Sequence, residues 1–319
     1  MRLLRAVLPA ALVFAACSLE PPDPASQAAA ILHKHPSDFL DRLVSLDALA
    51  AREVLGLEPG ESIRSGLAES LYAYTLRLRP ALAAVAFADS VAADSARIAV
   101  INAFVFDSLR IVPILDSAPL SASVPSLVLA HRKGSCVGLV LLYLALGRSL
   151  DLPLVPVFLP GHIAVRYRGG TGRDRGGTGG SADSVDRPAR NIETLRRGIP
   201  RTDSFYRETF SLRKRPWYSL FDAKPDQALA ALVFNLGNAH RAAGRLDAAR
   251  EEYRLVEEAL PGFPEALGNL GVCFLVSGEK ALAREKFLAA LAGDSLSEQA
   301  HRNLVVLEGR ESVEAPASR

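Results

Sequence analysis

A cysteine, a histidine and an acidic side chain occur in an order that could perform acyl transfer. Cys136 is the last polar residue before a long apolar run, His162 follows a Pro-Gly pair, and a further candidate strand carries Asn191 and Glu193. A thiol attacks a carbonyl when an imidazole takes its proton and a third side chain orients that imidazole. The sequence therefore favours a Cys136–His162 pair, with Glu193 or Asn191 as the third member.

The elements that must position these residues can be predicted from the hydrophobic pattern. Residues 136–149 are apolar on nearly every face, which is typical of a helix inside a domain. Ser135 can cap this helix, and the first-turn N–H groups and the helix dipole favour a thiolate at Cys136. Strands are expected over 154–158, and over 162–167, where alternation places His162 on one face and apolar residues on the other.

These residues resemble the transglutaminase-like superfamily of papain-type thiol proteins. The resemblance covers about residues 100–222 and rests on Lys-Gly-Ser-Cys at Cys136, a Leu-Tyr pair in the helix, Pro-Gly-His at His162, and Asn-Ile-Glu-Thr from Asn191. Within the superfamily the chain is similar to the SirB1-like branch. The resemblance implies an α+β core of a helix bundle and a small antiparallel sheet. Since the family's third member is usually an aspartate, the choice between Glu193 and Asn191 stays open.

The C-terminal part of the chain repeats with a period of 34 residues. The pairs that recur are Asn235 and Asn269, Leu236 and Leu270, Gly237 and Gly271, Gly244 and Gly278, Ala249 and Ala283, and Tyr253 and Phe287. This period resembles tetratricopeptide repeats, in which small residues let paired helices approach and an aromatic side chain fills the gap. An all-α repeat domain is predicted over 223–309, with a capping helix around 304–307 and a tail at 310–319.

The N-terminus has the features of a lipoprotein signal peptide. Two arginines precede an apolar run that is too short to span a bilayer, and Ala-Ala-Cys at Cys17 supplies a cleavage site. Residues 1–17 are therefore predicted as the signal and Cys17 as the lipidated residue, with plain secretion and nearby cleavage as the alternative. This assignment places the protein in the bacterial cell envelope, lipid-anchored at the periplasmic face of the outer membrane.

The remaining segments connect these parts. A proline-rich linker is predicted over 18–30, and the thiol domain over 31–222, with a helical lead-in over 31–120. Residues 169–188 are predicted to form a flexible hairpin insertion between two candidate strands. A glycine-rich stretch could also bind phosphate, but a phosphate-binding loop lies between a strand and a helix, and this stretch does not. The basic, aromatic stretch after Glu193 is interpreted as a connector in which Trp217 and Tyr218 anchor the next domain. The alternative is that this stretch forms a ligand-binding patch.

Composition excludes several classes of protein. The chain has 319 residues, 49% of them hydrophobic, which is enough for two folded units. Its 37 basic residues fall to 35 without the two arginines of residues 1–16, against 35 acidic residues, which argues against nucleic acid as a partner. The three cysteines imply no disulfide framework. His33 and His35 could suggest a metal, but no third ligand lies nearby in the sequence, and we predict neither metal nor cofactor.

Two main functions fit these observations. The first is a membrane-anchored thiol enzyme that hydrolyses or transfers acyl groups of a peptide or protein partner recruited by the repeats. The second is a non-catalytic, peptide-binding scaffold lipoprotein that retains the thiol fold. A third, plainer possibility makes Cys136 a buried core thiol. These possibilities can be distinguished by the distance and orientation of the Cys136 sulfur relative to the His162 ring, and by whether the pair is open to solvent.

Overall fold

The computed structural model describes residues 23–33, 38–57, 66–85, 90–115, 118–168 and 190–314. The predicted signal peptide with Cys17, the residue His35 and the glycine-rich segment 169–188 lie outside these ranges. Within them, every helix is too short or too polar to cross a membrane.

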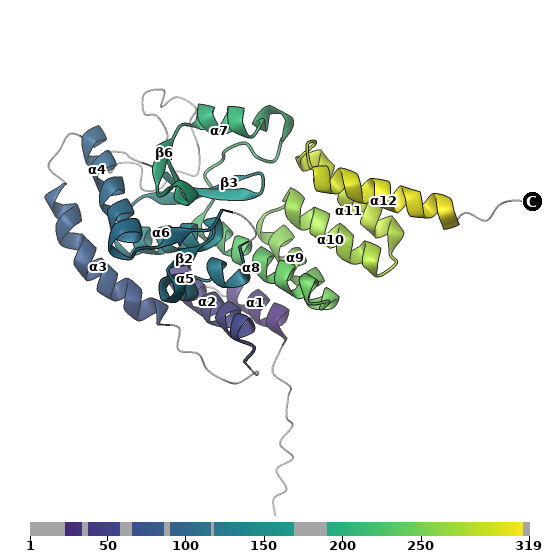
Figure 1. The fold of residues 1–319 in the computed structure, drawn as a ribbon, viewed down its shortest axis with the longest axis horizontal. Coiled ribbons are helices and arrows are strands. Elements are labelled where there is room, and N and C mark those ends of the chain that lie inside the picture. Colours follow the sequence, from purple (N-terminus) through teal and green to yellow (C-terminus); the bar gives the residue numbers. More distant parts are fainter. Residues whose placement is uncertain are drawn as a thin grey trace, which may run out of the picture.

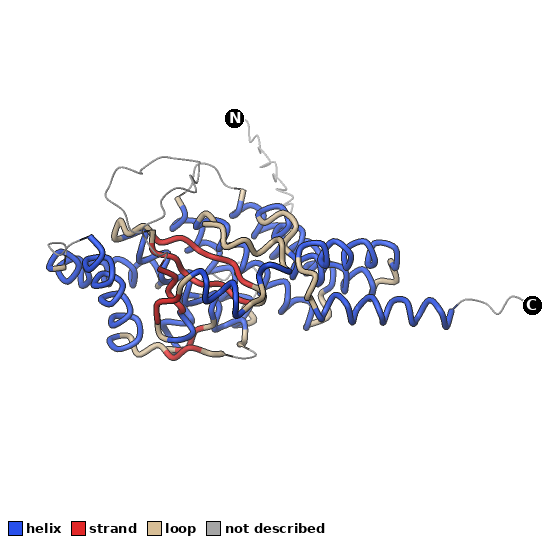
Figure 2. The backbone as a smooth tube through the Cα atoms, turned by 90° about the horizontal axis from the view of Figure 1, so that it is seen from above, coloured by secondary structure: helices blue, strands red, loops and turns tan. Residues whose placement is uncertain are grey.

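The chain is mainly helical, with a small sheet in its middle (Figure 1). Figure 2 shows the strands as one group among the helices, and the last helices extend away from it. The helices before the sheet are α1 (Pro24–Leu32), α2 (Phe39–Leu55), α3 (Leu67–Ala84), α4 (Ser90–Asn102) with its π-helical continuation η1 (Ala103–Ser108), the 3₁₀ helix η2 (Leu120–Ser123), α5 (Pro125–His131) and α6 (Cys136–Ser149). A short parallel pair, β1 (Val112–Pro113) with β2 (Lys133–Gly134), lies directly before α6.

The predicted apolar helix is α6, and it begins at Cys136 and ends at Ser149 as expected. Residues 137–147 are all buried, and α6 packs against α3, α5, β3 and β4. Ser135 is the N-cap, and its hydroxyl accepts a hydrogen bond from the backbone N–H of Gly138 at 3.3 Å. Because neighbours surround the helix, its first residue is held in a fixed place.

The sheet has four antiparallel strands in the order β3-β4-β5-β6. They are β3 (Leu154–Leu159), β4 (His162–Tyr167), β5 (Arg190–Glu193) and β6 (Ile199–Arg201), and the 3₁₀ helix η3 (Thr194–Arg196) joins the last two. Leu159 pairs with His162, so a tight turn with Gly161 at φ 63° precedes His162. Glycine adopts this left-handed conformation without steric cost. The predicted strands at 154–158 and 162–167 are confirmed.

The C-terminal region consists of paired helices. They are α8 (Pro225–Ala242), α9 (Leu246–Ala259), α10 (Pro264–Val276), α11 (Lys280–Gly293) and α12 (Glu298–Glu314). α11 begins 34 residues after α9, and α12 begins 34 residues after α10. A Cβ atom on Gly237 would lie 2.8 Å from the Tyr253 ring, and one on Gly271 would lie 2.6 Å from the Phe287 ring. The predicted packing of glycine against an aromatic ring is therefore present in both hairpins.

The two predicted units share one core. A single cluster of buried apolar side chains runs from Ala28 of α1, through α6 and the sheet, to Ala266 of α10. α8 supplies several of its members and packs against both α2 and α6. The hydrophobic core therefore continues across the predicted domain boundary at 222/223, and the two segments do not have separate cores. The predicted linker over 18–30 is helical from Pro24, because Ala25 and Ala28 are buried and α1 packs on α2 and α9.

The basic, aromatic stretch contains α7 (Asp203–Thr209) and the 3₁₀ helix η4 (Leu212–Lys214), and it then joins the sheet to the helical hairpins. The Trp217 ring lies 4.9 Å from that of Phe263 and 5.8 Å from that of Phe158 on β3. Its indole N–H donates to the carbonyl of Pro261 at 2.9 Å. Trp217 and Tyr218 thus anchor the following helices, as the connector hypothesis predicted.

Candidate functional site

Cys136 occupies the first position of α6 and is partly exposed. The first backbone N–H groups of a helix have no intrahelical acceptor and point toward whatever lies at the N-terminus. A thiolate at Cys136, or an oxyanion formed beside it, therefore sits where the helix favours negative charge. Cys273 is different, because it is fully buried in α10 and burial raises its pKa.

The His162 ring lies between Cys136 and Glu193. Its Nε2 atom is 3.0 Å from Oε1 and 3.1 Å from Oε2 of Glu193, and its side chain is 11% exposed. Because Nε2 faces the carboxylate, Nδ1 is the ring nitrogen left for the thiol of Cys136, with which the ring also interacts. Burial lowers the pKa of His162, but the hydrogen bonds and charges of Cys136 and Glu193 outweigh it and raise that pKa to about 9. The geometry thus favours an imidazolium beside the thiol at neutral pH.

Glu193 is fixed from two further directions. The Tyr206 hydroxyl donates to its Oε2 at 3.0 Å, and the Leu195 backbone N–H donates to its Oε1 at 3.2 Å. Burial raises the pKa of Glu193, yet its contacts with His162 and Tyr206 leave that pKa below its usual value. No sequence pattern predicts that Tyr206 belongs to the site, because Tyr206 lies in α7, within the stretch interpreted as a connector.

Asn191 contacts other partners. Its Oδ1 accepts from Nε of Arg166 at 2.9 Å, and its Nδ2 donates to Asp203 at 2.8 Å. Arg166 is buried on β4 and also pairs with Asp203 and Asp222, each at 2.6 Å. The side chain bonded to His162 is therefore that of Glu193, while Asn191 completes the polar shell around a buried arginine.

Two side chains of the C-terminal helices reach the segments that carry Cys136 and His162. Asn235 of α8 donates to the Ser123 hydroxyl at 2.9 Å, and Ser123 is 2.8 Å from the N-cap hydroxyl of Ser135. Glu265 of α10 accepts from the backbone N–H of Gly161 at 2.8 Å. No motif in the sequence indicates these two contacts.

Within the described ranges, no group of three or more His, Cys, Asp or Glu side chains is arranged to hold a metal ion. The exposed His33 side chain contacts Glu258 of α9, with Nε2 3.2 Å from Oε2. Its role in the structure is therefore a surface contact between α1 and α9.

Residues 68–178 match the family model described as the transglutaminase-like superfamily, so this part of the chain is a transglutaminase-like domain. The matched segment includes Cys136 and His162, whereas Glu193 and the C-terminal helices lie beyond it. No curated protein matches the sequence.

Proposed function

We propose that this chain, whose residues 68–178 form a transglutaminase-like domain, is a thiol enzyme that hydrolyses or transfers acyl groups. One observation carries the proposal: the His162 ring, which is only 11% exposed, is hydrogen-bonded to Glu193 through Nε2 and interacts with the partly exposed thiol of Cys136. A cysteine that only fills space in the core does not require a neighbouring imidazole that is hydrogen-bonded to a carboxylate. The arrangement supplies a nucleophile, a proton carrier and a group that orients the carrier.

The reaction follows from these positions. The Cys136 thiolate attacks the carbonyl carbon of an amide or ester, and the carbonyl oxygen takes up the negative charge near the backbone N–H of Cys136. The tetrahedral intermediate then breaks its C–N or C–O bond as the His162 imidazolium protonates the leaving amine or alcohol. A thioester on Cys136 remains. Water or an amine attacks it, His162 takes the proton of the attacking group, and the thiolate leaves.

Acetyl transfer from p-nitrophenyl acetate tests this function directly. The native protein should gain one acetyl group on Cys136 and release p-nitrophenolate, and intact-mass measurement would detect the thioester. Cys136→Ala should abolish this modification, and His162→Ala should slow it by about a hundredfold, the usual size of a lost acid–base group. Acetylation that is unchanged in Cys136→Ala would overturn the proposal.

Alkylation by iodoacetamide offers a second test that needs no substrate. Cys136 should react faster than Cys273, because Cys136 is partly exposed beside His162 whereas Cys273 is fully buried with a raised pKa. Peptide mapping after a short exposure measures both rates in one sample. Equal rates for the two cysteines at every pH would argue that Cys136 is not activated.

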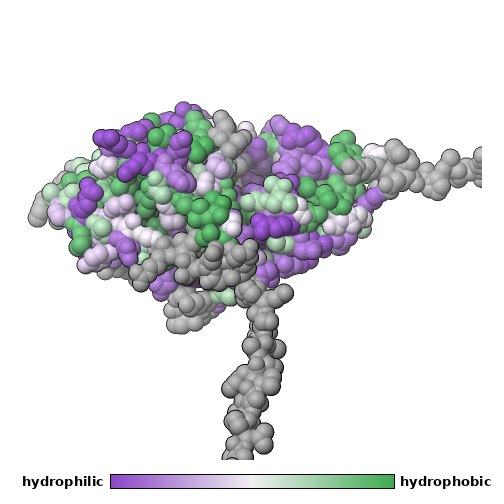
Figure 3. Space-filling view, turned by 60° about the horizontal axis from the view of Figure 1, so that its bottom comes forward, coloured by the Kyte–Doolittle hydropathy of each residue, from purple (hydrophilic) through white to green (hydrophobic). Residues whose placement is uncertain are grey.

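The helical hairpins are proposed to recruit the peptide or protein partner, as tetratricopeptide repeats do. This proposal rests on the 34-residue spacing of the helices and on apolar side chains left in solvent at the last two, where Leu288 is 44% exposed and Val305 is 69% exposed. Figure 3 shows hydrophobic surface at the end of the molecule from which the C-terminal trace leaves. If partner capture persists in Cys136→Ala while acetyl transfer fails in the native protein, the non-catalytic scaffold becomes the better description.

Lipid attachment at Cys17 remains part of the proposal for the location of the protein. It is supported by the sequence of residues 1–17 and by the proline-containing segment that follows. Cys17→Ser expressed in a bacterial host should move the protein out of the membrane fraction, while Ser18→Ala should leave it there. Membrane association of Cys17→Ser that equals that of the native protein would contradict the anchor.

A further inference from the structure

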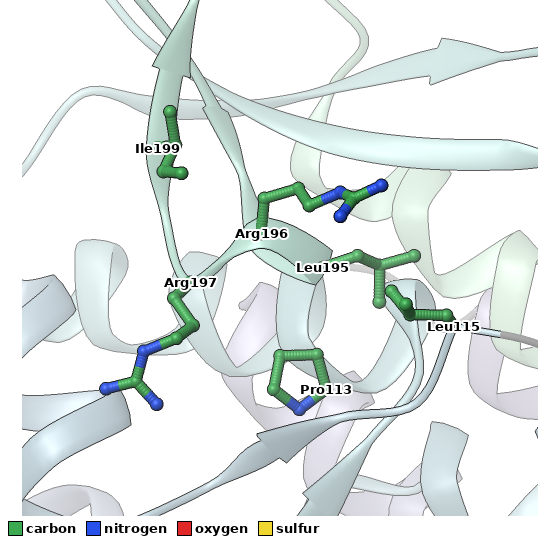
Figure 4. Close-up of a pocket in the computed structure, with 6 residues that line it drawn as sticks. All are labelled: Pro113, Leu115, Leu195, Arg196, Arg197 and Ile199. Atoms are coloured by element: carbon green, nitrogen blue, oxygen red, sulfur yellow. The ribbon is translucent and has the colours of Figure 1, made fainter.

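An apolar groove is formed by segments that adjoin those carrying Cys136 and Glu193. Its volume is about 330 Å³, and it is lined by Pro113, Leu115, Leu195, Arg196, Arg197 and Ile199 (Figure 4). This volume is near the lower limit of ligand-binding pockets, so the groove can take one or two side chains and not a large cofactor. The wall is apolar although it is open to water: Leu115 is 56% exposed and Ile199 is 47% exposed.

Both walls of the groove are attached to the site. On one side, Pro113 pairs with Gly134, two residues before Cys136, and the N–H of Ile114, directly after β1, donates to the Gly134 carbonyl at 2.8 Å. On the other side, Leu195 comes two residues after Glu193 and donates its N–H to the Glu193 carboxylate. Two residues span about 7 Å of chain, so a peptide lying in the groove can place its carbonyl near the thiol.

The two arginines of the groove are not equivalent. Arg197 is paired with Asp107 at 2.5 Å, and its guanidinium lies over the Phe106 ring at 5.4 Å. Arg196 is exposed and forms no ion pair with any residue of the described ranges. In Figure 4 the Arg196 side chain extends on the side of Leu195, whereas Arg197 extends in the opposite direction. Arg196 is therefore the cation available to a ligand.

We propose that this groove binds the acyl donor as a peptide segment in which an apolar side chain lies next to a carboxylate. The apolar side chain packs on Leu195 and Ile199, and the carboxylate pairs with Arg196. The inference rests on the proposed acyl transfer at Cys136 and adds the class of its substrate. A charge-assisted contact between guanidinium and carboxylate also fixes the direction in which the peptide lies.

Peptide vinyl sulfones test this assignment, because Cys136 adds to the vinyl carbon and the rate of labelling reports how well the peptide sits. The probes are acetyl-Glu-Leu, acetyl-Lys-Leu and acetyl-Glu-Ser vinyl sulfone, used on the full chain. The native protein should react with the Glu-Leu probe about tenfold faster than with the Lys-Leu probe, as expected for one charge-assisted hydrogen bond. Arg196→Glu should reverse that preference.

Matched variants separate the groove from general surface effects. Arg284→Glu replaces an exposed arginine of α11 and should keep the native preference. Ile199→Ser should reduce the advantage of Leu over Ser in the probe, while Leu76→Ser, at a leucine of α3 that is 55% exposed, should not. A preference that is the same in Arg196→Glu and the native protein would overturn the groove assignment.

Iodoacetamide, which is too small to reach the groove from the thiol, distinguishes the two possible failures. If iodoacetamide labels Cys136 faster than Cys273 but the peptide probes show no preference, the groove assignment is wrong and the proposed acyl transfer stands. If no reagent labels Cys136 faster than Cys273, the proposed acyl transfer itself is wrong.

Discussion

Glu265, near the start of α10, accepts a hydrogen bond from the backbone N–H of Gly161 at 2.8 Å, directly before His162 in the β3–β4 turn. Its other carboxylate oxygen accepts from the Tyr218 hydroxyl. The two residues of this contact are 104 positions apart in the chain. A C-terminal helix therefore holds the turn that carries the imidazole of the site, and the hairpins act as part of the support of that site.

Glu265→Gln should slow the alkylation of Cys136 by iodoacetamide about two- to tenfold. The amide keeps one acceptor oxygen in place of two, so one of the bonds to Gly161 and Tyr218 is lost, and a single hydrogen bond contributes roughly 0.5–1.5 kcal/mol. Glu285→Gln, on the exposed side of α11, is the matched control. Cys273 reports unfolding in the same sample: faster labelling of both cysteines would mean that Glu265→Gln loosens the whole fold and does not act on the turn.

Ser135→Ala should lower the free energy of unfolding by about 1 kcal/mol, because the first turn of α6 loses its side-chain cap. It also removes the end of the hydrogen-bond series from Asn235 through Ser123 to Ser135. Urea unfolding measures the stability change. Asn235→Ala should leave the cap itself in place and still slow Cys136 alkylation. Unchanged alkylation in Asn235→Ala would show that the series does not influence the thiol.

The His162 ring should titrate with a midpoint near pH 9 in the native protein, as followed by the ring proton shifts in NMR spectra. Burial lowers the pKa of the ring, but the hydrogen bonds with Cys136 and Glu193 and the charges of these two groups outweigh that effect and favour the protonated ring. Glu193→Gln removes a negative charge and should move the midpoint to lower pH. Tyr206→Phe keeps that charge and should change the midpoint less. A midpoint near 6.5, the value of a free histidine, in the native protein would contradict this arrangement.

A buried histidine outside the site makes the stability of the fold depend on pH. His240 of α8 is fully buried, with Nδ1 2.8 Å from Glu252 and Nε2 3.2 Å from Glu53 of α2. Burial lowers its pKa, but hydrogen bonds to the two glutamates raise it to about 9. A raised pKa stabilises the folded state fully below about pH 6.5, the unfolded value, and this contribution is lost as the pH rises through 9.

The free energy of unfolding should therefore fall between pH 6.5 and 9, by about 3 kcal/mol for each histidine with such a shift. His162 has a similar shift, so two groups contribute. His240→Gln should remove its own share of the pH dependence while leaving the labelling of Cys136 unchanged. Denaturant unfolding at several pH values measures this, and a pH dependence identical to that of the native protein would contradict the assigned role of His240.

The sequence by itself determined the elements of the site. The apolar run after Cys136 predicts a buried helix, and the alternation from His162 to Tyr167 predicts a strand. The alternation suggested burial of one face, whereas both faces of β4 are buried, because Ala164 and Arg166 on the face of His162 are covered as well. The observed bounds of α6 and β4 agree with these expectations. The 34-residue period was equally informative, because each of the repeated glycines, Gly237 and Gly271, faces an aromatic ring of its own helical hairpin. These features depend on residues that are close together in the chain, and they can therefore be predicted from the sequence alone.

Only the tertiary structure decided between Glu193 and Asn191. The two side chains lie two residues apart on the same strand, so alternation assigns them to the same face and cannot rank them. The register decides, because Asn191 is paired with Arg166 across β4 and β5, whereas Glu193 lies at the end of β5 and its carboxylate reaches His162. The same is true of Glu265 and Asn235, which reach the site from helices that the sequence places in another domain. Their contribution comes from the packing of distant segments into one core, and no local pattern of residues encodes it.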